Sequence, residues 1–262
     1  MTILPVRTAV LLGACLLASA PVHALTLLTE ENAPFNYTEG GRLTGLSSDI
    51  VAEMAKRAGV TVQTQSQAWE KAYQTAQADK DTCVYSTARL ENRERLFQWV
   101  GPFATNRWAV FGKSDFAVPV KNITDLRKLK IGGVAADAKV DFLMSKAVTN
   151  LRLSGNDTQV PPKLLLKKDD PNYVDLWITG YYSARKVAEA AKVKDIKMVY
   201  VVREEDLYLA CSPRTSKDEV KKLSDALASM VKDGTVKKNH RSLRKAFHAV
   251  ILPARRYITA SR

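Results

Sequence analysis

Residues that could ligate a metal are scarce in this chain of 262 residues, which has three cysteines and three histidines. None of them shows the spacing of a metal site. Two of the histidines, His240 and His248, lie in a basic C-terminal stretch, so no Ser–His–Asp or Cys–His arrangement can be assembled. Beyond residue 24, no apolar run approaches the roughly 20 residues that a transmembrane helix needs. The sequence therefore predicts no metal centre, no cofactor, no catalytic triad and no transmembrane protein.

Residues 1–24 are typical of a secretory signal peptide. Arg7 is their only charged residue, the apolar run Ala9–Ala20 follows it, and Val22–Ala24 forms a small-residue cleavage site. Cys15 gives the segment a faint similarity to a lipoprotein signal, but the apolar run continues past that residue. Ordinary cleavage is therefore favoured over lipidation, and we expect residues 25–262 to be exported to the periplasm.

Two cysteines, Cys83 and Cys211, remain beyond the signal segment. An even number of cysteines in an exported protein suggests a disulfide. Each lies in an apolar, strand-like segment, so neighbouring strands could bring the two together. The alternative is a pair of separate buried thiols, since free cysteine packs as a small apolar residue. We expect the disulfide.

Positive charge is concentrated at the C-terminus. The chain carries a formal net charge of +13, and residues 235–262 contain eight Lys or Arg residues and no acidic residue. No nucleic-acid recognition motif accompanies this charge, so no nucleic-acid partner is expected. A solvated tail is the favoured interpretation, with contact to an anionic membrane surface as the second.

Strand-like and helix-like segments alternate along the chain, which predicts an α/β architecture with a largely parallel sheet. Strands are expected at Leu25–Thr29, Val60–Thr64, around Cys83, and at Trp108–Phe111, Lys130–Val134, Val174–Thr179, Lys197–Val202 and Leu207–Cys211. Helices are expected at 47–58, around 69–76, and at 138–146, 161–168, 182–191 and 217–232.

Two polar segments, 113–121 and 203–206, interrupt this alternation and suggest crossings between two structural units. They predict a first lobe made of residues 25–112 and 205–262, and a second lobe made of residues 113–204. Two strands would then form the hinge, and a ligand-binding cleft would lie between the lobes.

The segment 83–103 carries the strongest functional signal. Ser86 and Thr87 stand near the end of a buried strand, and Arg89 and Arg93 follow them. Hydroxyls and guanidinium groups at a strand's carboxyl end are suited to hold an anionic ligand, because arginine makes paired hydrogen bonds to a carboxylate. The alternative is a surface helix whose Arg and Glu side chains pair with each other.

Several motifs, in this order, cover nearly all of the chain after the signal segment. They are 29–37 (TEENAPFNY), 45–50 (GLSSDI), 90–102 (LENRERLFQWVGP), 125–134 (DLRKLKIGGV), 174–177 (VDLW) and 233–235 (DGT). In this series the chain resembles the bacterial extracellular solute-binding proteins of family 3. The resemblance implies a type II periplasmic binding protein fold, with two α/β lobes joined by a two-strand hinge. It also implies a monomer that captures amino acids or similar small polar solutes and passes them to an ABC-type importer.

The resemblance also implies roles for particular residues. Arg93 matches the family arginine that binds a ligand carboxylate, and Trp69 stands where a large side chain often covers the ligand. Further ligand contacts are expected near Arg93, in the first loop and in the second lobe: Arg89, Ser86, Thr87, Phe35, Tyr37, Glu31, Gly133, Ala136 and Asp137.

One position departs from the family pattern. Amino-acid binders commonly place a carboxylate after a strand of the second lobe to pair with the ligand's amino group, and this chain has Gly180 there. Asp137 or Glu31 could substitute for it, and a carboxylate or other small polar anion remains open as the ligand. Two other functions are considered: a dehydratase-type enzyme on the same fold, with Glu31 or Asp137 as general acid, and a ligand-sensing accessory protein.

Overall fold

The computed structural model describes residues 24–241. The expected signal peptide, except for Ala24, lies outside the described residues, as do Cys15 and most of the basic C-terminal segment. Within residues 24–241, no helix combines the length and apolar character needed to cross a bilayer.

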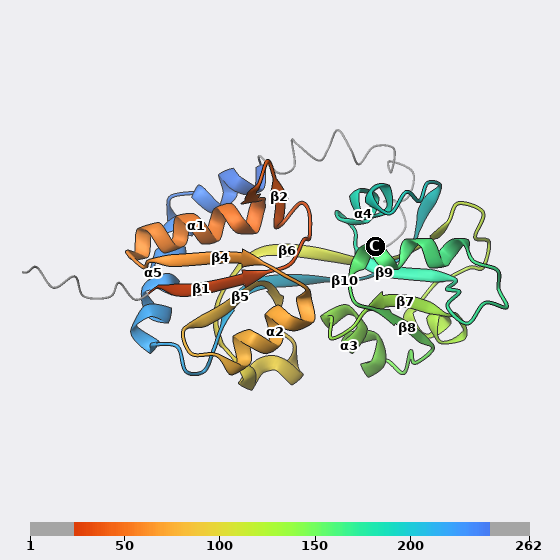
Figure 1. Ribbon diagram of the computed structural model, residues 1–262, viewed down its shortest axis with the longest axis horizontal. Coiled ribbons are helices and arrows are strands. Elements are labelled where there is room, and N and C mark those ends of the chain that lie inside the picture. The colour runs from red at the N-terminus through yellow and green to blue at the C-terminus, as the bar shows by residue number, and fades with distance from the viewer. Residues whose placement is uncertain (1–23, 242–262) are drawn as a thin grey trace, which may run out of the picture.

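A sheet of eight strands runs through the whole molecule in the order β4-β1-β5-β10-β6-β9-β7-β8, with helices on both of its faces (Figure 1). Its strands are β1 (Leu25–Thr29), β4 (Val62–Ser66), β5 (Thr82–Ala88), β6 (Gln98–Lys113), β7 (Ile131–Val134), β8 (Leu151–Ser154), β9 (Leu176–Gly180) and β10 (Ile196–Cys211). A separate hairpin is formed by β2 (Tyr37–Glu39) and β3 (Arg42–Thr44).

The helices are α1 (Leu46–Ala58), α2 (Trp69–Ala78), α3 (Ala138–Ser145), α4 (Ala184–Ala190) and α5 (Lys217–Lys232). Four short 3-10 helices are η1 (Glu91–Leu96), η2 (Ile123–Lys128), η3 (Asp157–Gln159) and η4 (Pro161–Leu165). The first lobe consists of β1, β4, β5, α1, α2 and α5, and the second of β7, β8, β9, α3 and α4. Each lobe therefore has parallel strands with helices packed against them, which confirms the expected α/β architecture.

The two long antiparallel strands β6 and β10 join the lobes. The C-terminal end of β10 pairs with β5 of the first lobe, and residues 108–111 of β6 pair with β9 of the second. The sequence predicted two separate strands, Lys197–Val202 and Leu207–Cys211, but they form one continuous strand. The charged stretch between them stays in the sheet because its side chains find partners on β6.

Two of these cross-strand partners are well defined. Arg107 donates from Nε to Glu204 at 2.9 Å, and Thr105 donates from Oγ1 to Asp206 at 2.7 Å. The predicted lobe boundaries, at residues 112 and 204, stay a prediction. Residues 108–111 of β6 already pair with β9 of the second lobe.

The first lobe is stabilised by an apolar core and a covalent link. Ile50 and Met54 on α1, and Leu223 and Met230 on α5, are buried in one cluster with the sheet. The helix α1 ends at Gly59, whose φ of 64° is the left-handed conformation common after helix ends. The expected disulfide is present: Cys83 and Cys211 are directly opposite each other on β5 and β10.

Candidate ligand-binding site

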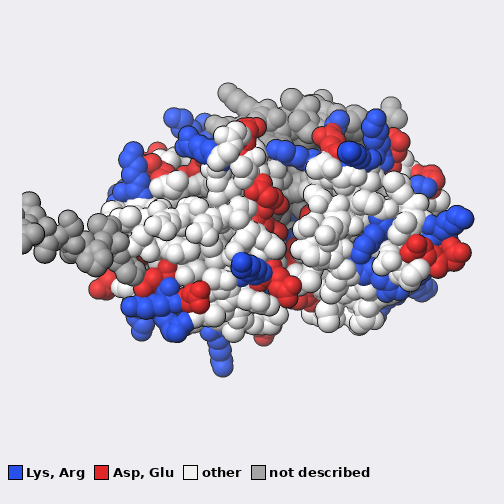
Figure 2. Space-filling view, viewed as in Figure 1, with Lys and Arg blue, Asp and Glu red and all other residues white. Residues whose placement is uncertain are grey.

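A polar cavity lies between the lobes, where side chains from both of them meet. Figure 2 shows acidic side chains gathered along the furrow between the two halves on one face of the molecule. The cavity has a volume of about 20 Å³, enough for about one water molecule. It is lined by Glu30, Asn32, Trp69, Ser86, Ala88, Asn106, Trp108, Asp137, Ala138, Lys139 and Leu207.

Strand ends of the first lobe supply one wall of this cavity. Glu30 follows β1 directly, and Ser86 lies near the end of the parallel neighbour β5. Asn36, which is fully buried, connects them: its Nδ2 donates to the Glu30 carbonyl at 2.6 Å and its Oδ1 accepts from Ser86 Oγ. Carboxyl ends of parallel strands commonly form ligand crevices, and these contacts fix two such ends in place.

The opposite wall comes from the start of α3 in the second lobe, with η3 behind it. Asp137 caps α3 by accepting from the Lys139 backbone nitrogen, and its other oxygen accepts from Lys139 Nζ at 2.6 Å. Asp157 accepts from Trp177 Nε1 at 2.8 Å and from Thr179 Oγ1 at 2.6 Å. We call Glu30, Asp137, Asp157 and Lys139 the charged cluster.

Burial and mutual charge shift the pKa values of this cluster. Burial, reinforced by the Asp137 carboxylate, raises the pKa of Glu30 from 4.5 to about 8. Burial also raises the pKa of Asp157, against the opposing effect of Lys139. Burial lowers the pKa of Lys139, but the negative charges of Asp137, Asp157 and Glu30 together outweigh this effect, so its pKa is raised. Glu30 is therefore mostly protonated at neutral pH, whereas Lys139 is charged.

Direct hydrogen bonds cross from one lobe to the other beside the cavity. Trp69 Nε1 and Arg93 Nη2 both donate to the Ala136 carbonyl, each at 3.0 Å. Ala136 has a φ of 57°, a left-handed conformation that is uncommon for a residue with a side chain. Ser183 Oγ also donates to Asn32 Oδ1 at 2.6 Å. These contacts hold the lobes against each other.

Five of the residues expected to bind ligand lie at this junction. Trp69, Ser86 and Asp137 line the cavity, and Ala136 supplies the carbonyl that bridges the lobes. Arg93 lies beside them with only 2% of its surface exposed, but its Nη2 donates to Asp141 at 2.6 Å and its guanidinium lies 4.8 Å from the Tyr73 ring.

The other expected residues do not line the cavity. Arg89 pairs with Glu94 at the surface, which is the Arg–Glu pairing that the sequence offered as the alternative to ligand binding. Thr87 is buried and bonds to Val84 of its own strand. Phe35 is buried in the core of the first lobe. Gly133 is packed against the side chains of Val140 and Ile178. Tyr37 lies on the hairpin, where Lys186 Nζ is 3.9 Å from the centre of its ring.

Glu31 points away from the cavity. Its carboxylate accepts from the Thr38 backbone nitrogen and hydroxyl, each at 2.8 Å, and from Ser66 Oγ at 2.9 Å. These hydrogen bonds outweigh partial burial and lower the pKa of Glu31. The cavity-lining acid is its neighbour Glu30, which sequence reasoning missed together with Asn32, Asn106, Lys139 and Asp157.

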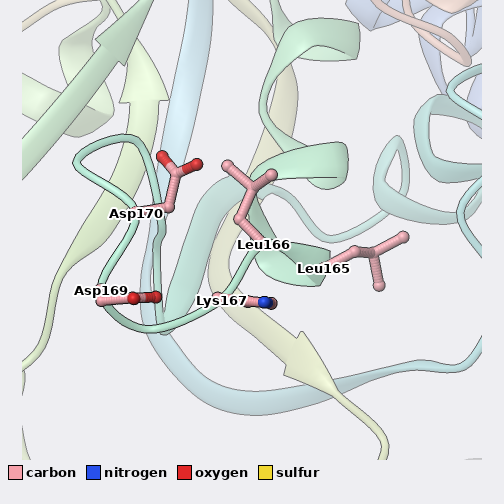
Figure 3. A pocket seen from close by; sticks show the side chains of 5 residues that line it. All are labelled: Leu165, Leu166, Lys167, Asp169 and Asp170. Carbon is pink, nitrogen blue, oxygen red and sulfur yellow. The ribbon is translucent and has the colours of Figure 1, made fainter.

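A second hollow lies on the surface of the second lobe and has a volume of about 460 Å³. Its lining residues, Leu165, Leu166, Lys167, Asp169 and Asp170, all belong to one short stretch that begins at the last residue of η4 (Figure 3). No group from another element converges on it, so it lacks the opposed polar groups of a binding site.

Similar solved structures share the architecture of this chain. An ancestral arginine-binding protein bound to arginine is 21% identical, with a TM-score of 0.72 over 84% of this chain and 97% of that one. A histidine kinase sensor domain with similarity to periplasmic binding proteins is 15% identical, with a TM-score of 0.73 over 84% and 95%. The ancestral amino acid-binding protein AncCDT-1, a precursor of cyclohexadienyl dehydratase, is 21% identical, with a TM-score of 0.67 over 84% and 94%.

At these identities the similarity shows the fold, which is that of the type II periplasmic binding proteins. No protein in a search of curated sequences matches the chain. The model of one family does match, over residues 25–243. The chain therefore belongs to the bacterial extracellular solute-binding proteins, family 3.

Proposed function

We propose that this protein is a periplasmic substrate-binding protein that captures a small polar solute between its lobes and delivers it to an ABC-type importer. The observation that carries this proposal is the cavity between the lobes, where Glu30 and Ser86 of one lobe face Asp137 and Lys139 of the other. A solute bound there would touch both lobes at once, so its binding would stabilise their contact.

The solute enters by separation of the lobes. The cavity of about 20 Å³ is far smaller than an amino acid, and within residues 24–241 the backbone passes from one lobe to the other along β6 and β10, which run side by side. Hinge opening at two extended strands is a common motion of such folds. We propose residues 25–112 and 205–262 for the first moving body and residues 113–204 for the second.

Calorimetry and thermal shift test this proposal. The protein without residues 1–24 is screened against amino acids, amines, organic acids and cyclic dicarboxylates, and a hit is titrated. A ligand at 100 times its Kd adds about 2.7 kcal/mol to stability, which a thermal shift detects readily. Small-angle scattering should show compaction on binding. Absence of any stabilising solute across these classes would argue against a substrate-binding function.

A second candidate function follows from Glu30. A dehydratase needs a general acid in its cleft, and a carboxyl group with a pKa of about 8 is protonated at neutral pH. Glu30 is better suited to this role than Glu31, which is hydrogen-bonded outside the cavity. Incubation with cyclic dicarboxylates, followed by chromatography, distinguishes the two functions: a bound but unchanged compound supports the binder, and loss of water from it supports the enzyme.

A further inference from the structure

We propose that the solute of this protein presents a hydroxyl group, and no ammonium group, to the side chain of Asn106 in the cavity between the lobes. The class of solute that combines such a hydroxyl with a negatively charged group is the small hydroxy acids. This inference rests on the proposed function, and it names both the class of solute and the residue that sets specificity.

Asn106 borders the cavity with an acceptor that lacks a partner. It stands in the middle of β6, where this strand passes between the lobes, and it is 3% exposed. Its Oδ1 is buried and has no hydrogen-bond partner within residues 24–241. A buried acceptor without a donor is unfavourable, and a donor from a bound solute would remove that cost. Asn106 is therefore placed to contact the solute.

Gly180, the last residue of β9, leaves the room that the Asn106 side chain takes. A Cβ atom at position 180 would lie 3.0 Å from Asn106 Nδ2, 3.1 Å from Asn106 Oδ1 and 3.1 Å from Ser183 Oγ. The side chains of Asn106 and Ser183 thus converge where a side chain of residue 180 would stand. A carboxylate at position 180 would have to displace this amide, so the glycine goes together with a neutral group here.

The surroundings of Asn106 are polar and uncharged. Ser183 Oγ donates to Asn32 Oδ1 at 2.6 Å, and Asn32 also lines the cavity. We call Asn32, Asn106 and Ser183 the neutral corner. Amides and hydroxyls both donate and accept hydrogen bonds, as a solute hydroxyl does, whereas an ammonium group only donates. Burying an ammonium against neutral groups is also costly, so a hydroxyl is the better complement.

The acidic residues of the cavity wall leave no unpaired negative charge for an ammonium group. Asp137 Oδ1 accepts from the Lys139 backbone nitrogen at 2.8 Å, and Asp137 Oδ2 accepts from Lys139 Nζ at 2.6 Å. The charge of Lys139 therefore balances that of Asp137. Glu30 is mostly protonated at neutral pH, because burial raises its pKa to about 8.

Donors for a negatively charged group lie beside the cavity. Arg93 is 2% exposed, and its Nε and Nη1 are buried without a hydrogen-bond partner in the part of the chain that the structure describes. Guanidinium donors of this kind suit a carboxylate. A hydroxy acid carries the carboxylate that these donors favour and the hydroxyl that the neutral corner favours.

The test compares hydroxy acids with amino acids of the same carbon skeleton by calorimetry, on the protein without residues 1–24. The pairs are L-lactate with L-alanine, L-malate with L-aspartate, and L-2-hydroxyglutarate with L-glutamate. Within each pair a hydroxyl group stands in place of an ammonium group. We expect at least one hydroxy acid to bind at least about tenfold more tightly than its amino acid, because a site built around one hydrogen-bonding group discriminates against another.

Two substitutions of Asn106 locate the effect. Asn106→Asp keeps the shape of the side chain and adds a negative charge, so it should shift the ratio of affinities at least about tenfold towards the amino acid. Asn106→Ala removes the amide and should weaken hydroxy-acid binding at least about tenfold without improving amino-acid binding. The Ala variant decides the question if the buried Asp prevents folding. Asn172→Asp, on an exposed turn before β9, is the matched control and should leave the ratio unchanged.

The outcomes separate this inference from the proposed function. An amino acid that binds as tightly as its hydroxy acid or more tightly, or binding that neither substitution of Asn106 changes, would overturn the inference and leave the substrate-binding function in place. If none of the six compounds binds, the strongest solute of the wider screen decides: a hydroxyl without an ammonium group supports the inference, and any other solute overturns it. Failure of every solute class would remove the proposed function itself.

Discussion

Arg93 Nη2 lies 2.6 Å from Asp141 Oδ2, and this ion pair joins the two lobes. The arginine is nearly fully buried, whereas the Asp141 side chain is 31% exposed. Nη2 of the residue expected to bind a ligand carboxylate therefore holds a carboxylate of the protein's own second lobe, while its Nε and Nη1 are buried without a hydrogen-bond partner among the described residues. Together with the bond from Arg93 to the Ala136 carbonyl, this pair acts as a latch between the lobes.

Replacing Asp141 by Asn should weaken the latch. The buried guanidinium would lose its charged partner, so we expect the free energy of unfolding to fall by about 1–3 kcal/mol. Small-angle scattering should report a larger average radius of gyration. Asp225→Asn is the matched control, because its pair with Lys221 is exposed on α5 and should contribute at most about 0.5 kcal/mol. Equal effects of the two variants would contradict the latch.

Replacing Glu30 by Gln should change how stability depends on pH. The pKa of Glu30 in the folded protein is about 8 and its ordinary value is 4.5. Between these values the folded state binds more protons than the unfolded state, so stability falls as the pH rises through this window. The slope is at most about 1.4 kcal/mol per pH unit, and the Gln variant should lose it. Urea unfolding at pH 5, 6.5 and 8 measures the slope; identical slopes in both proteins would refute the prediction.

Replacing Glu31 by Gln should have the opposite effect. Its hydrogen bonds to Thr38 and Ser66 lower its pKa, so its contribution to stability is present above pH 4.5 and is lost as the pH falls through its lowered pKa. We expect a loss of about 1 kcal/mol at pH 7 and a smaller loss in acid. Chemical denaturation at pH 7 and pH 3 compares the two conditions. A loss that is larger in acid would disprove this assignment.

Reduction of the disulfide should lower the melting temperature. Cys83 and Cys211 are separated by 128 residues, and a crosslink over such a long loop restricts the unfolded chain, with a typical contribution of about 2–4 kcal/mol. Calorimetry with and without reductant measures the change. Alkylation of both thiols in the unreduced native protein would show instead that the bond does not form.

Local patterns in the sequence predicted much of the fold. The apolar faces of α1 and α5, with Met54 and Leu223 among their buried residues, follow the helical period, and both helices form as expected. The continuity of β10 was missed, because the charges of residues 203–206 are typical of a loop. Only their partners on β6, about a hundred residues away, keep them in the sheet.

The site was only partly predictable. Trp69, Ser86 and Asp137, three of the residues expected to bind ligand, line the cavity; Ser86 and Asp137 stand near a strand end and a helix start that are visible in the sequence, and Trp69 was expected from the resemblance. The choice between Glu30 and Glu31 was not, since successive side chains on extended backbone point in opposite directions. Which of them faces the cavity depends on the position of β1 between β4 and β5.

The sequence by itself predicted the α/β architecture and the family, because these follow from local periodicity and from motifs in a fixed order, and it favoured the disulfide because the two cysteines form an even pair in a chain expected to be exported. Tertiary structure alone decided the partner of Arg93 and the composition of the charged cluster. Asp141 and Asp157 meet the first lobe only after β6 and β10 bring the two lobes together. Contacts between residues so far apart depend on the packing of the lobes, which no local pattern contains.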